Sequence, residues 1–573
     1  MRARLVLSLL SILLVTPAQT QVADEVEALV EAYHAADRFN GSALVSDGGD
    51  VVWAGGVGVA NAEWTVPNTA DTRFRIGSVT KQFTAALVLQ LMEQGLVDLH
   101  VPVSTYVPEV PVDERITTHH LLTHTSGLFN YTSLPDLSEF MGIEHTPAEV
   151  MARIEDKPLD FEPGDGWQYS NTGYILLGMI VENVTGQSFA DALQDRLLDP
   201  LRLTATAYDD GTTVYPNAAS GYSRSSRGLR QADHLDPSVP YAAGMMRSTM
   251  GDLMRWSDAL FEGRVFESPE TLALMNTAHA AVPNNENAAY GYGVFVGTAP
   301  VGDQRVTFVQ HGGGINGFTT SFWRLTDRDA VIALSSNTQD GSEGMAADIA
   351  ALLYGEEVEA PKPSSLAILR GALETGGVSA VETAFEASQS RDDIEVTEDD
   401  LNRLGYEVLE TDATETAVAL FRLNVAAYPD AWNPRDSLGE ALLAAGDTTA
   451  SIASYREALE RNPGAASARD ALTALGVDLG TVTVPAEVLA RYVGMYQFQP
   501  GLIMDVRVEE GVLIAHPSGQ GPVALSPVSE TEFVPPFEGR LVFESGDPSP
   551  AAVLYRGGAE MRGVRIDEAT DTR

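Results

Sequence analysis

The sequence predicts an α+β fold in which one antiparallel sheet, flanked by helices, is completed by strands from both ends of the same region. Near the N-terminus, residues 42–46 and 51–54 have strand patterns and flank an Asp-Gly-Gly-Asp turn, which predicts a β-hairpin. Residues 81–259 follow a largely helical pattern, as expected of a helical subdomain inserted into the sheet. Strand patterns return at residues 291–296, 306–310, 319–325 and 330–335, and residues 344–354 form a predicted closing helix.

The N-terminal residues have the order of a secretory signal. Two arginines precede an apolar run over residues 5–15, and small residues follow around Pro17. Because this run is too short to span a bilayer, residues 1–20 are interpreted as a signal peptide. We therefore expect export to the periplasm or the medium. The alternative, a buried N-terminal helix, fits the preceding arginines less well.

Composition excludes several classes of function. At 573 residues the chain is too long for one ordinary core, so several domains are expected. The net charge of −44 argues against nucleic acid or an anionic membrane as partner, and the absence of cysteine excludes disulfides and thiol nucleophiles. Only three residues are lysine: Lys81, Lys157 and Lys362. An acidic, lysine-poor surface suits a salt-rich habitat, although an ordinary acidic secreted protein explains it equally well.

The C-terminal third has a different organisation. A linker is predicted over residues 357–374, after which Leu404-Gly405, Phe421 and Pro429 recur 34 residues later as Leu438-Gly439, Tyr455 and Pro463. This period resembles tetratricopeptide repeats, so residues 375–478 are expected to form paired helices that can bind a protein partner. Short alternating strand patterns then predict a small all-β domain over residues 484–568.

Ser78 and Lys81 are the first candidate pair for chemistry. Side chains three apart on a helix share one face, with Cβ atoms roughly 5–6 Å apart. Such a pair supplies a hydroxyl nucleophile and an amine base, provided that burial lowers the lysine pKa. The alternative is a capping serine followed by a solvated lysine. The strongly apolar helix that follows favours the catalytic interpretation.

Two further motifs carry suitable side chains. In Tyr169-Ser170-Asn171 the phenol can relay a proton and the amide can hold a lysine and a substrate carbonyl. In His311-Gly312-Gly313-Gly314, after the strand at 306–310, glycines allow a substrate to lie against the backbone, and the imidazole can donate to the substrate or to Tyr169. A glycine-rich loop also occurs in α/β-hydrolases, but the Gly-x-Ser-x-Gly sequence which that fold needs is absent from the chain.

In this order and spacing, the three motifs resemble the serine β-lactamase and DD-peptidase superfamily. The resemblance is strongest to the branch of class C β-lactamases, D-Ala-D-Ala carboxypeptidases, D-aminopeptidases and related esterases, and it extends to Leu121-Leu-Thr-His-Thr-Ser-Gly-Leu128. It implies a β-lactamase/transpeptidase-like domain over residues 23–356 that acts through an acyl-enzyme, without metal or cofactor. Further residues then receive roles by resemblance. The resemblance implies that Ser78 is acylated, that Lys81 is the base and that Tyr169 transfers protons. It implies that Asn171 orients the lysine and the substrate carbonyl, and that His311 replaces a lysine. The N–H groups of Ser78 and Gly314 would form the oxyanion hole, and Gly312 and Gly313 would contact substrate.

The histidine at position 311 shapes the expected substrate. Histidine is mostly neutral at pH 7, so a substrate carboxylate loses a charge-assisted contact worth roughly 1.5–3 kcal/mol. Esterase or D-amino-acid peptidase (D-aminopeptidase) action is therefore expected before efficient β-lactamase action. The resemblance also includes D-Ala-D-Ala carboxypeptidase-like action, and it allows weak β-lactamase action. The alternative function is a catalytically silent peptidoglycan-binding or scaffold protein that recruits a partner through the repeats.

Nearby aromatic and histidine side chains allow further interpretations. Phe129 and Tyr131 are candidates to line the substrate pocket, or they are ordinary core residues. His119, His120 and His124 could suggest a metal site, but no acidic motif completes one. We expect His124 instead to anchor the turn that follows it.

Overall fold

The computed structural model describes residues 17–566 except 226–227, 284, 286, 339–341, 412, 478–483, 500–501, 510, 518–522, 536–538 and 557–558. Most of the predicted signal segment lies outside the described residues. Among those that are described, no helix combines the length and apolarity needed to cross a bilayer.

The centre of the first region is an eight-stranded antiparallel sheet, which confirms the predicted α+β fold. Its strand order is β10-β11-β12-β13-β14-β15-β1-β2, so the N-terminal hairpin pairs with the last strand, with Gly41 opposite Ser336. The strands are β1 (Gly41–Asp47), β2 (Asp50–Val57), β10 (Ala280–Ala281), β11 (Ala288–Tyr290), β12 (Phe295–Val301), β13 (Gln304–Ile315), β14 (Phe318–Leu325) and β15 (Ala330–Ser336).

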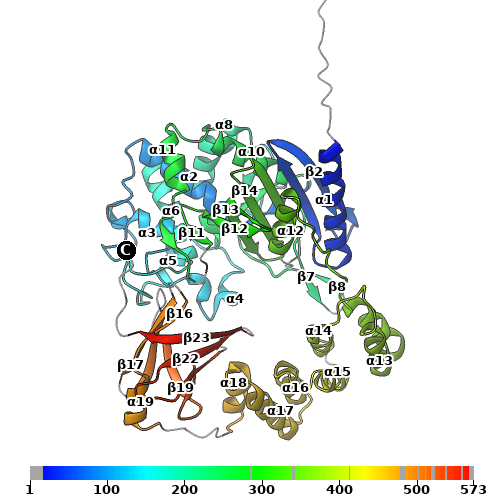
Figure 1. Cartoon of the computed structure of the whole chain (residues 1–573). Coiled ribbons are helices and arrows are strands. Elements are labelled where there is room, and N and C mark those ends of the chain that lie inside the picture. Colours follow the sequence, from blue (N-terminus) through cyan, green and yellow to red (C-terminus); the bar gives the residue numbers. More distant parts are fainter. Residues whose placement is uncertain are drawn as a thin grey trace, which may run out of the picture.

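The sheet separates two hydrophobic cores, and β15 contributes to both because strand side chains alternate between faces. Ile332 and Leu334 pack with helices α1 (Pro17–Ala35) and α12 (Glu343–Leu353), whereas Val331 and Ala333 pack into the larger helical core. Figure 1 shows α1 and α12 on one side of the sheet and the helical subdomain on the other. A strand buried on both faces explains why the sequence of β15 is almost entirely apolar.

The helical subdomain surrounds α2 (Thr80–Glu93), which is buried along most of its length. The other helices and turns in this region are η1 (Gly77–Val79), η2 (Val103–Thr105), α3 (Thr118–Thr123), η3 (Tyr131–Ser133), α4 (Leu137–Phe140), α5 (Pro147–Ala152), α6 (Asn171–Thr185), α7 (Phe189–Leu193), η4 (Gln194–Leu198), α8 (Asp199–Leu201), α9 (Tyr241–Gly244), α10 (Met250–Phe261) and α11 (Pro269–Met275). Small outer strands complete it: β3 (Val59–Asn61), β4 (Val66–Pro67), β5 (Phe74–Arg75), β6 (Ala207–Tyr208), β7 (Tyr222–Ser225), β8 (Gly228–Gln231) and β9 (Met246–Ser248).

The next region consists of helices that pack in antiparallel pairs. They are α13 (Leu366–Ser388), α14 (Glu398–Leu409), α15 (Thr414–Ala427), α16 (Asn433–Ala444), α17 (Thr448–Arg461) and α18 (Ala466–Ala474). Gly405 lies against the ring of Phe421, and Gly439 lies against the ring of Tyr455 in the same way. The residues that repeat in the sequence are thus the contact points within α14–α15 and within α16–α17. Helix α13 begins inside the segment expected to be a linker.

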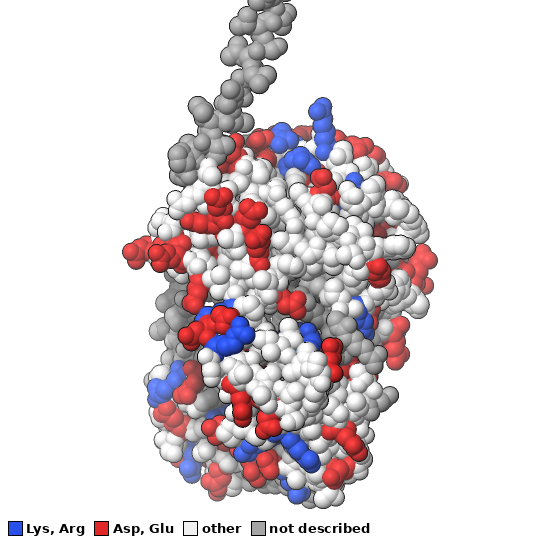
Figure 2. Space-filling view, turned by 90° about the vertical axis from the view of Figure 1, so that its right-hand side faces the viewer, with Lys and Arg blue, Asp and Glu red and all other residues white. Residues whose placement is uncertain are grey.

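The last region is a closed antiparallel barrel of eight strands. Its elements are α19 (Ala486–Tyr492), β16 (Gly494–Gln499), β17 (Leu502–Glu509), β18 (Val512–Pro517), β19 (Val523–Pro527), β20 (Glu532–Val534), β21 (Arg540–Phe543), β22 (Ala551–Arg556) and β23 (Ala559–Ile566). Aromatic and aliphatic side chains, among them Tyr496, Phe533 and Phe543, fill its interior. Figure 1 shows the helices and the barrel below the sheet region, and Figure 2 shows carboxylates spread over one face with few basic groups between them.

Candidate active site

Ser78 and Lys81 meet at the start of α2. Ser78 lies in the short turn η1, and Lys81 follows one turn later with its side chain fully buried, at 0% exposure. The Lys81 Nζ atom is 3.0 Å from Ser78 Oγ, 2.8 Å from Asn171 Oδ1 and 2.7 Å from the Ala243 carbonyl oxygen. Asn171 and Ala243 are far from Ser78 and Lys81 in the sequence, so the fold brings these groups together.

The environment of Lys81 favours its neutral form. Burial lowers the pKa of Lys81 well below its usual value of 10.5, because a charged amine is poorly stabilised away from water. A neutral amine has two N–H groups and one lone pair. With its two N–H groups donated to Asn171 Oδ1 and the Ala243 oxygen, the lone pair is left for the Ser78 hydroxyl. This is the arrangement of a general base beside its nucleophile.

Tyr169 lies beside the same lysine. The Lys81 Nζ atom is 4.9 Å from the centre of the Tyr169 ring. Burial raises the pKa of Tyr169, although the nearby Ser78 hydroxyl offsets part of the rise, and the Tyr169 hydroxyl has no hydrogen-bond partner among the described residues. Tyr169 is therefore a protonated phenol at neutral pH and can donate.

His311 is buried in β13, at 2% exposure. Its Nδ1 atom is 2.6 Å from the Gly312 carbonyl oxygen and its Nε2 atom is 3.0 Å from the Tyr290 hydroxyl. Because a carbonyl only accepts, we assign the proton to Nδ1, and Tyr290 then donates to Nε2. Both ring nitrogens are occupied, so His311 does not make the expected donation to Tyr169. Burial lowers the pKa of His311 to about 3, so the ring is neutral.

The glycines after His311 continue β13 instead of following the strand, as the sequence had suggested. β13 runs to Ile315, with Gly314 opposite Thr319 of β14. A Cβ atom on Gly313 would overlap with the Ile76 carbonyl oxygen, and one on Gly77 would lie 2.8 Å from the Gly314 nitrogen. The lack of side chains therefore lets β13 lie directly against η1, which brings the backbones of Gly314 and Ser78 to the same place.

A cavity of about 160 Å³ opens beside Ser78. Besides Ser78, Asn171 and Gly314, its walls are mostly apolar, and they include Tyr131 but not Phe129, Gly312 or Gly313. No lysine, arginine, histidine or carboxylate is among its lining residues, all of which are described. The remaining lining residues are Thr132, Leu137, Met141, Leu235, Val239, Pro240, Ala243, Gly244, Ile315 and Asn316.

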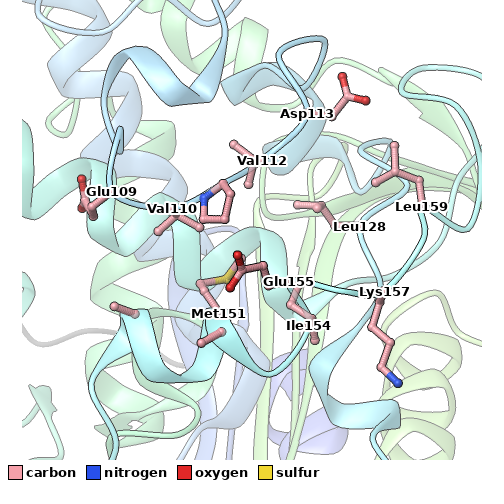
Figure 3. A pocket seen from close by; sticks show the side chains of 13 residues that line it. Glu109, Val110, Val112, Asp113, Leu128, Met151, Ile154, Glu155, Lys157 and Leu159 are labelled. Atoms are coloured by element: carbon pink, nitrogen blue, oxygen red, sulfur yellow. The ribbon is translucent and has the colours of Figure 1, made fainter.

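A second cavity of about 260 Å³ lies beside α5. Figure 3 shows Val112, Leu128 and Ile154 around its apolar centre, while the Lys157 ammonium points away from it. Phe129 lies on this side, with its ring 5.6 Å from Lys157 Nζ. Phe129 is not among the residues that line the cavity beside Ser78, whereas Tyr131 is.

The three adjacent histidines have separate partners. The Nδ1 atom of His119 is 2.8 Å from the Tyr292 hydroxyl, His120 helps to cap α3 and His124 accepts from the Ser170 N–H. Among the described residues no group of three or more histidine, aspartate or glutamate side chains is arranged to hold a metal ion.

Sequence reasoning missed the Ala243 carbonyl and Tyr290. The sequence does not show which backbone carbonyl will accept a hydrogen bond from a distant side chain. Tyr290 had a usable signal, because Tyr290-Gly291-Tyr292-Gly293 alternates aromatic residues with glycines. A Cβ atom on Gly293 would lie 2.6 Å from the Lys81 carbonyl oxygen, so this segment packs directly against α2.

A serine paired with a buried lysine at the end of an antiparallel sheet is the arrangement of a serine hydrolase with a β-lactamase-like fold. Fold and site together define this class. Residues 26–356, more than half of the chain, match the sequence model described as Beta-lactamase. The protein therefore belongs to the Beta-lactamase family.

Two curated relatives illustrate the range of the family. Penicillin-binding protein 4* of Bacillus subtilis (strain 168) is 26% identical over 358 residues, which cover 59% of this chain and 77% of the relative. The teichoic acid D-alanine hydrolase of Staphylococcus aureus (strain MRSA252) is 28% identical over 270 residues, covering 47% of this chain and 65% of the relative. The chain thus spans just under two thirds of that hydrolase.

Solved structures agree on the fold. A D-stereospecific amidohydrolase from Streptomyces sp. is 30% identical, with a TM-score of 0.50 over 57% of this chain and 97% of its own. The D-amino acid amidase of Ochrobactrum anthropi SV3 is 26% identical, with a TM-score of 0.52 over 58% and 99%. An octameric penicillin-binding protein homologue from Pyrococcus abyssi is 21% identical, with a TM-score of 0.53 over 94% of this chain and 99% of its own. At this identity the likeness concerns the fold alone.

Proposed function

We propose that this protein is an exported hydrolase that cleaves esters or amides without a carboxylate, D-amino-acid amides among them, through an acyl-enzyme at Ser78. The observation that carries the proposal is the position of the buried Lys81 amine, 3.0 Å from Ser78 Oγ and held by two further acceptors. Such a contact allows the hydroxyl to lose its proton as it attacks.

The proposed reaction has two steps. The Ser78 hydroxyl transfers its proton to neutral Lys81 while its oxygen attacks the substrate carbonyl. The N–H groups of Ser78 and Gly314 stabilise the resulting oxyanion, a contribution of about 3–4 kcal/mol per donor. Tyr169 gives its phenolic proton to the leaving group and recovers one from the Lys81 ammonium. Water then hydrolyses the ester at Ser78, with Lys81 and Tyr169 again transferring the protons and Asn171 holding Lys81.

The proposed substrate class follows from the cavity beside Ser78. Its volume of about 160 Å³ is close to the roughly 150 Å³ of an engineered apolar cavity that binds benzene. No charged side chain lines it, and the neutral His311 offers no anchor for a carboxylate. An apolar acyl or side-chain group fits this space. The printed names of the D-amino acid amidase and of the D-stereospecific amidohydrolase support D-amino-acid amides as one such class.

The remaining parts of the proposal concern the division of the chain into domains. We infer a signal peptide over residues 1–20, a hydrolase domain over 23–356, tetratricopeptide-like repeats over 375–478 and a β-domain over 484–568. The contacts of Gly405 with Phe421 and of Gly439 with Tyr455 support the repeats. A protein partner of these repeats is part of the same proposal.

Labelling of the purified protein with a fluorophosphonate tests the chemistry. We expect labelling of the wild type and none of Ser78→Ala, together with turnover of short-chain esters and D-amino-acid amides. Turnover of nitrocefin and of D-Ala-D-Ala peptides should be much slower, because these substrates carry a carboxylate. A wild type that folds but neither labels nor hydrolyses any of these compounds would support a silent binding protein instead.

A further inference from the structure

One turn holds the loop that carries Tyr169. Residues 160–170 form no regular strand or helix before α6, yet their backbone is fixed by residues 124–127. The N–H groups of Asp160 and Gly164 donate to the carbonyl oxygens of Gly127 and Thr125, each at 2.8 Å. Nearer to Tyr169, the backbone N–H groups of Gln168 and Ser170 both donate to a single residue, His124.

His124 binds the residues on both sides of Tyr169. The Gln168 N–H donates to the His124 carbonyl oxygen at 3.0 Å, and the Ser170 N–H donates to the His124 Nδ1 atom at 3.2 Å. The backbone and the side chain of His124 are thus both used. Because the residues before and after Tyr169 are fixed to the same partner, the direction in which Tyr169 leaves the backbone is fixed as well.

The conformation of His124 suits this role. It ends α3 in the left-handed region, with φ at 62°, and its own N–H donates back into α3. Gly127 follows with φ at 70°, and a Cβ atom there would overlap with the Phe161 carbonyl oxygen. The turn and the loop are therefore packed backbone to backbone, which leaves little freedom for either.

The imidazole also forms the wall behind the Tyr169 ring. His124 is 1% exposed, and its ring centre lies 4.3 Å from that of Tyr169 and 4.5 Å from that of Tyr290. Since Nδ1 accepts the Ser170 N–H, we assign the ring proton to Nε2. The Tyr169 ring, which packs against this imidazole, has its centre 4.9 Å from the Lys81 Nζ atom.

We propose that His124 is a positioning residue for the reaction, which sets the Tyr169 phenol relative to Ser78 and Lys81 without touching the reacting atoms. This inference rests on the proposed function, because it assumes that Tyr169 transfers a proton. It also assigns a role to the sequence Leu121–Leu128, which the chemistry alone leaves unexplained. The turn at residues 124–127 fixes the backbone of residues 160–170, the loop that carries Tyr169.

Three substitutions separate the contributions of His124. Asparagine tolerates the left-handed region, and its Oδ1 atom takes the place of Nδ1, so His124→Asn keeps the acceptor for Ser170. Glutamine has its acceptor one bond further out, and alanine has none. We expect His124→Gln and His124→Ala to lower kcat by roughly 10²-fold with little change in KM, since small misplacements of catalytic groups have effects of this size. His124→Asn should recover most of kcat.

Controls distinguish positioning from simple loss of stability. Each variant is titrated with the fluorophosphonate, so that kcat refers to folded enzyme, and its melting temperature is measured. Ile349→Ala, buried against α1 on the far side of the sheet, should lower the melting temperature and leave kcat unchanged. If His124→Ala does not fold, the comparison of asparagine with glutamine still decides the matter.

Two results would overturn the inference. One is an unchanged kcat in titrated His124→Gln or His124→Ala enzyme, and the other is an equal loss in His124→Asn and His124→Gln. Failure of the wild type to label at Ser78 is a different result, because it removes the proposed function itself and is seen before any variant is compared.

Discussion

At the scale of single residues, burial decides the protonation states of the site. Lys81 and His311 are both neutral because charge is costly where they lie, and Tyr169 keeps its proton for the same reason. The result is a neutral amine 3.0 Å from the Ser78 hydroxyl, with a protonated phenol close by. The sequence supplied the residue types, but burial comes from the packing of segments far apart in the chain.

Replacement of Lys81 tests the base directly. We expect Lys81→Met to slow fluorophosphonate labelling of Ser78 by roughly 10²–10⁴-fold, the usual contribution of a general base. Lys157→Met is the matched control, because this exposed lysine lies beside Phe129 and not beside Ser78. Labelling of Lys81→Met at the wild-type rate would assign the base to another group.

The cavity wall allows a test of substrate charge. Met141 lines the cavity beside Ser78, so Met141→Lys places an ammonium where a substrate carboxylate would lie. We expect the ratio of kcat/KM for a succinyl ester over a butyryl ester to rise roughly tenfold or more, as a charge-assisted hydrogen bond would give. Ile143→Lys, at a position 59% exposed, is the control and should not change the ratio. An unchanged ratio in Met141→Lys would place the acyl group elsewhere.

At the scale of elements, the sequence predicted what depends on local pattern and missed what depends on contact. The hairpin of β1 and β2 and the strands β14 and β15 follow from turn residues and from short runs of apolar residues. The extension of β13 through its glycines does not, because glycine has low strand propensity and only the approach of η1 explains it. The start of α13 was missed for a similar reason, since the carboxylate that accepts from Ser364 and Ser365 is Asp400 of another helix.

The helical pairs provide a prediction at this scale. A Cβ atom on Gly439 would lie 2.8 Å from the ring of Tyr455, so Gly439→Val forces α16 and α17 apart. We expect a loss of roughly 1–3 kcal/mol in the unfolding free energy of this helical region, typical of overpacking, with esterase activity unchanged. Urea unfolding followed by circular dichroism measures it.

Gly371 serves as the control for that substitution. No atom lies within 4 Å of a Cβ placed on this residue of α13. Gly371→Ala should therefore stabilise the helix by up to about 1 kcal/mol, because alanine has the higher helix propensity. If Gly371→Ala and Gly439→Val changed the unfolding free energy in the same direction, the packing argument for Gly439 would be contradicted.

At the scale of the whole molecule, histidine burial makes the fold sensitive to acid. Burial lowers the pKa of five histidines, to about 4 for His119 and about 3 for His311, from the usual 6.5. The other three are His120, His124 and His279. Their unfolded forms bind protons first as the pH falls, so the stability that these groups contribute is complete above pH 6.5 and is lost as the pH falls from there toward 3.

We expect the melting temperature to decrease steadily between pH 6.5 and pH 5, above the range in which most carboxylates are protonated. Scanning calorimetry over this range measures the effect, and a matched scan of His234→Gln, at a surface position, should superimpose on the wild type. A melting temperature that stays constant down to pH 5 would show that the buried rings are protonated at little cost.

The pairing of β1 with β15 has a consequence for how the chain matures. Ser336 leaves the ribosome almost three hundred residues after Gly41, yet the two are partners in the sheet. Until β15 is made, the first hairpin has an open edge that could pair with another chain. A cell that makes this protein must keep that edge covered during synthesis, and the helices and barrel that follow are translated only after the sheet can close.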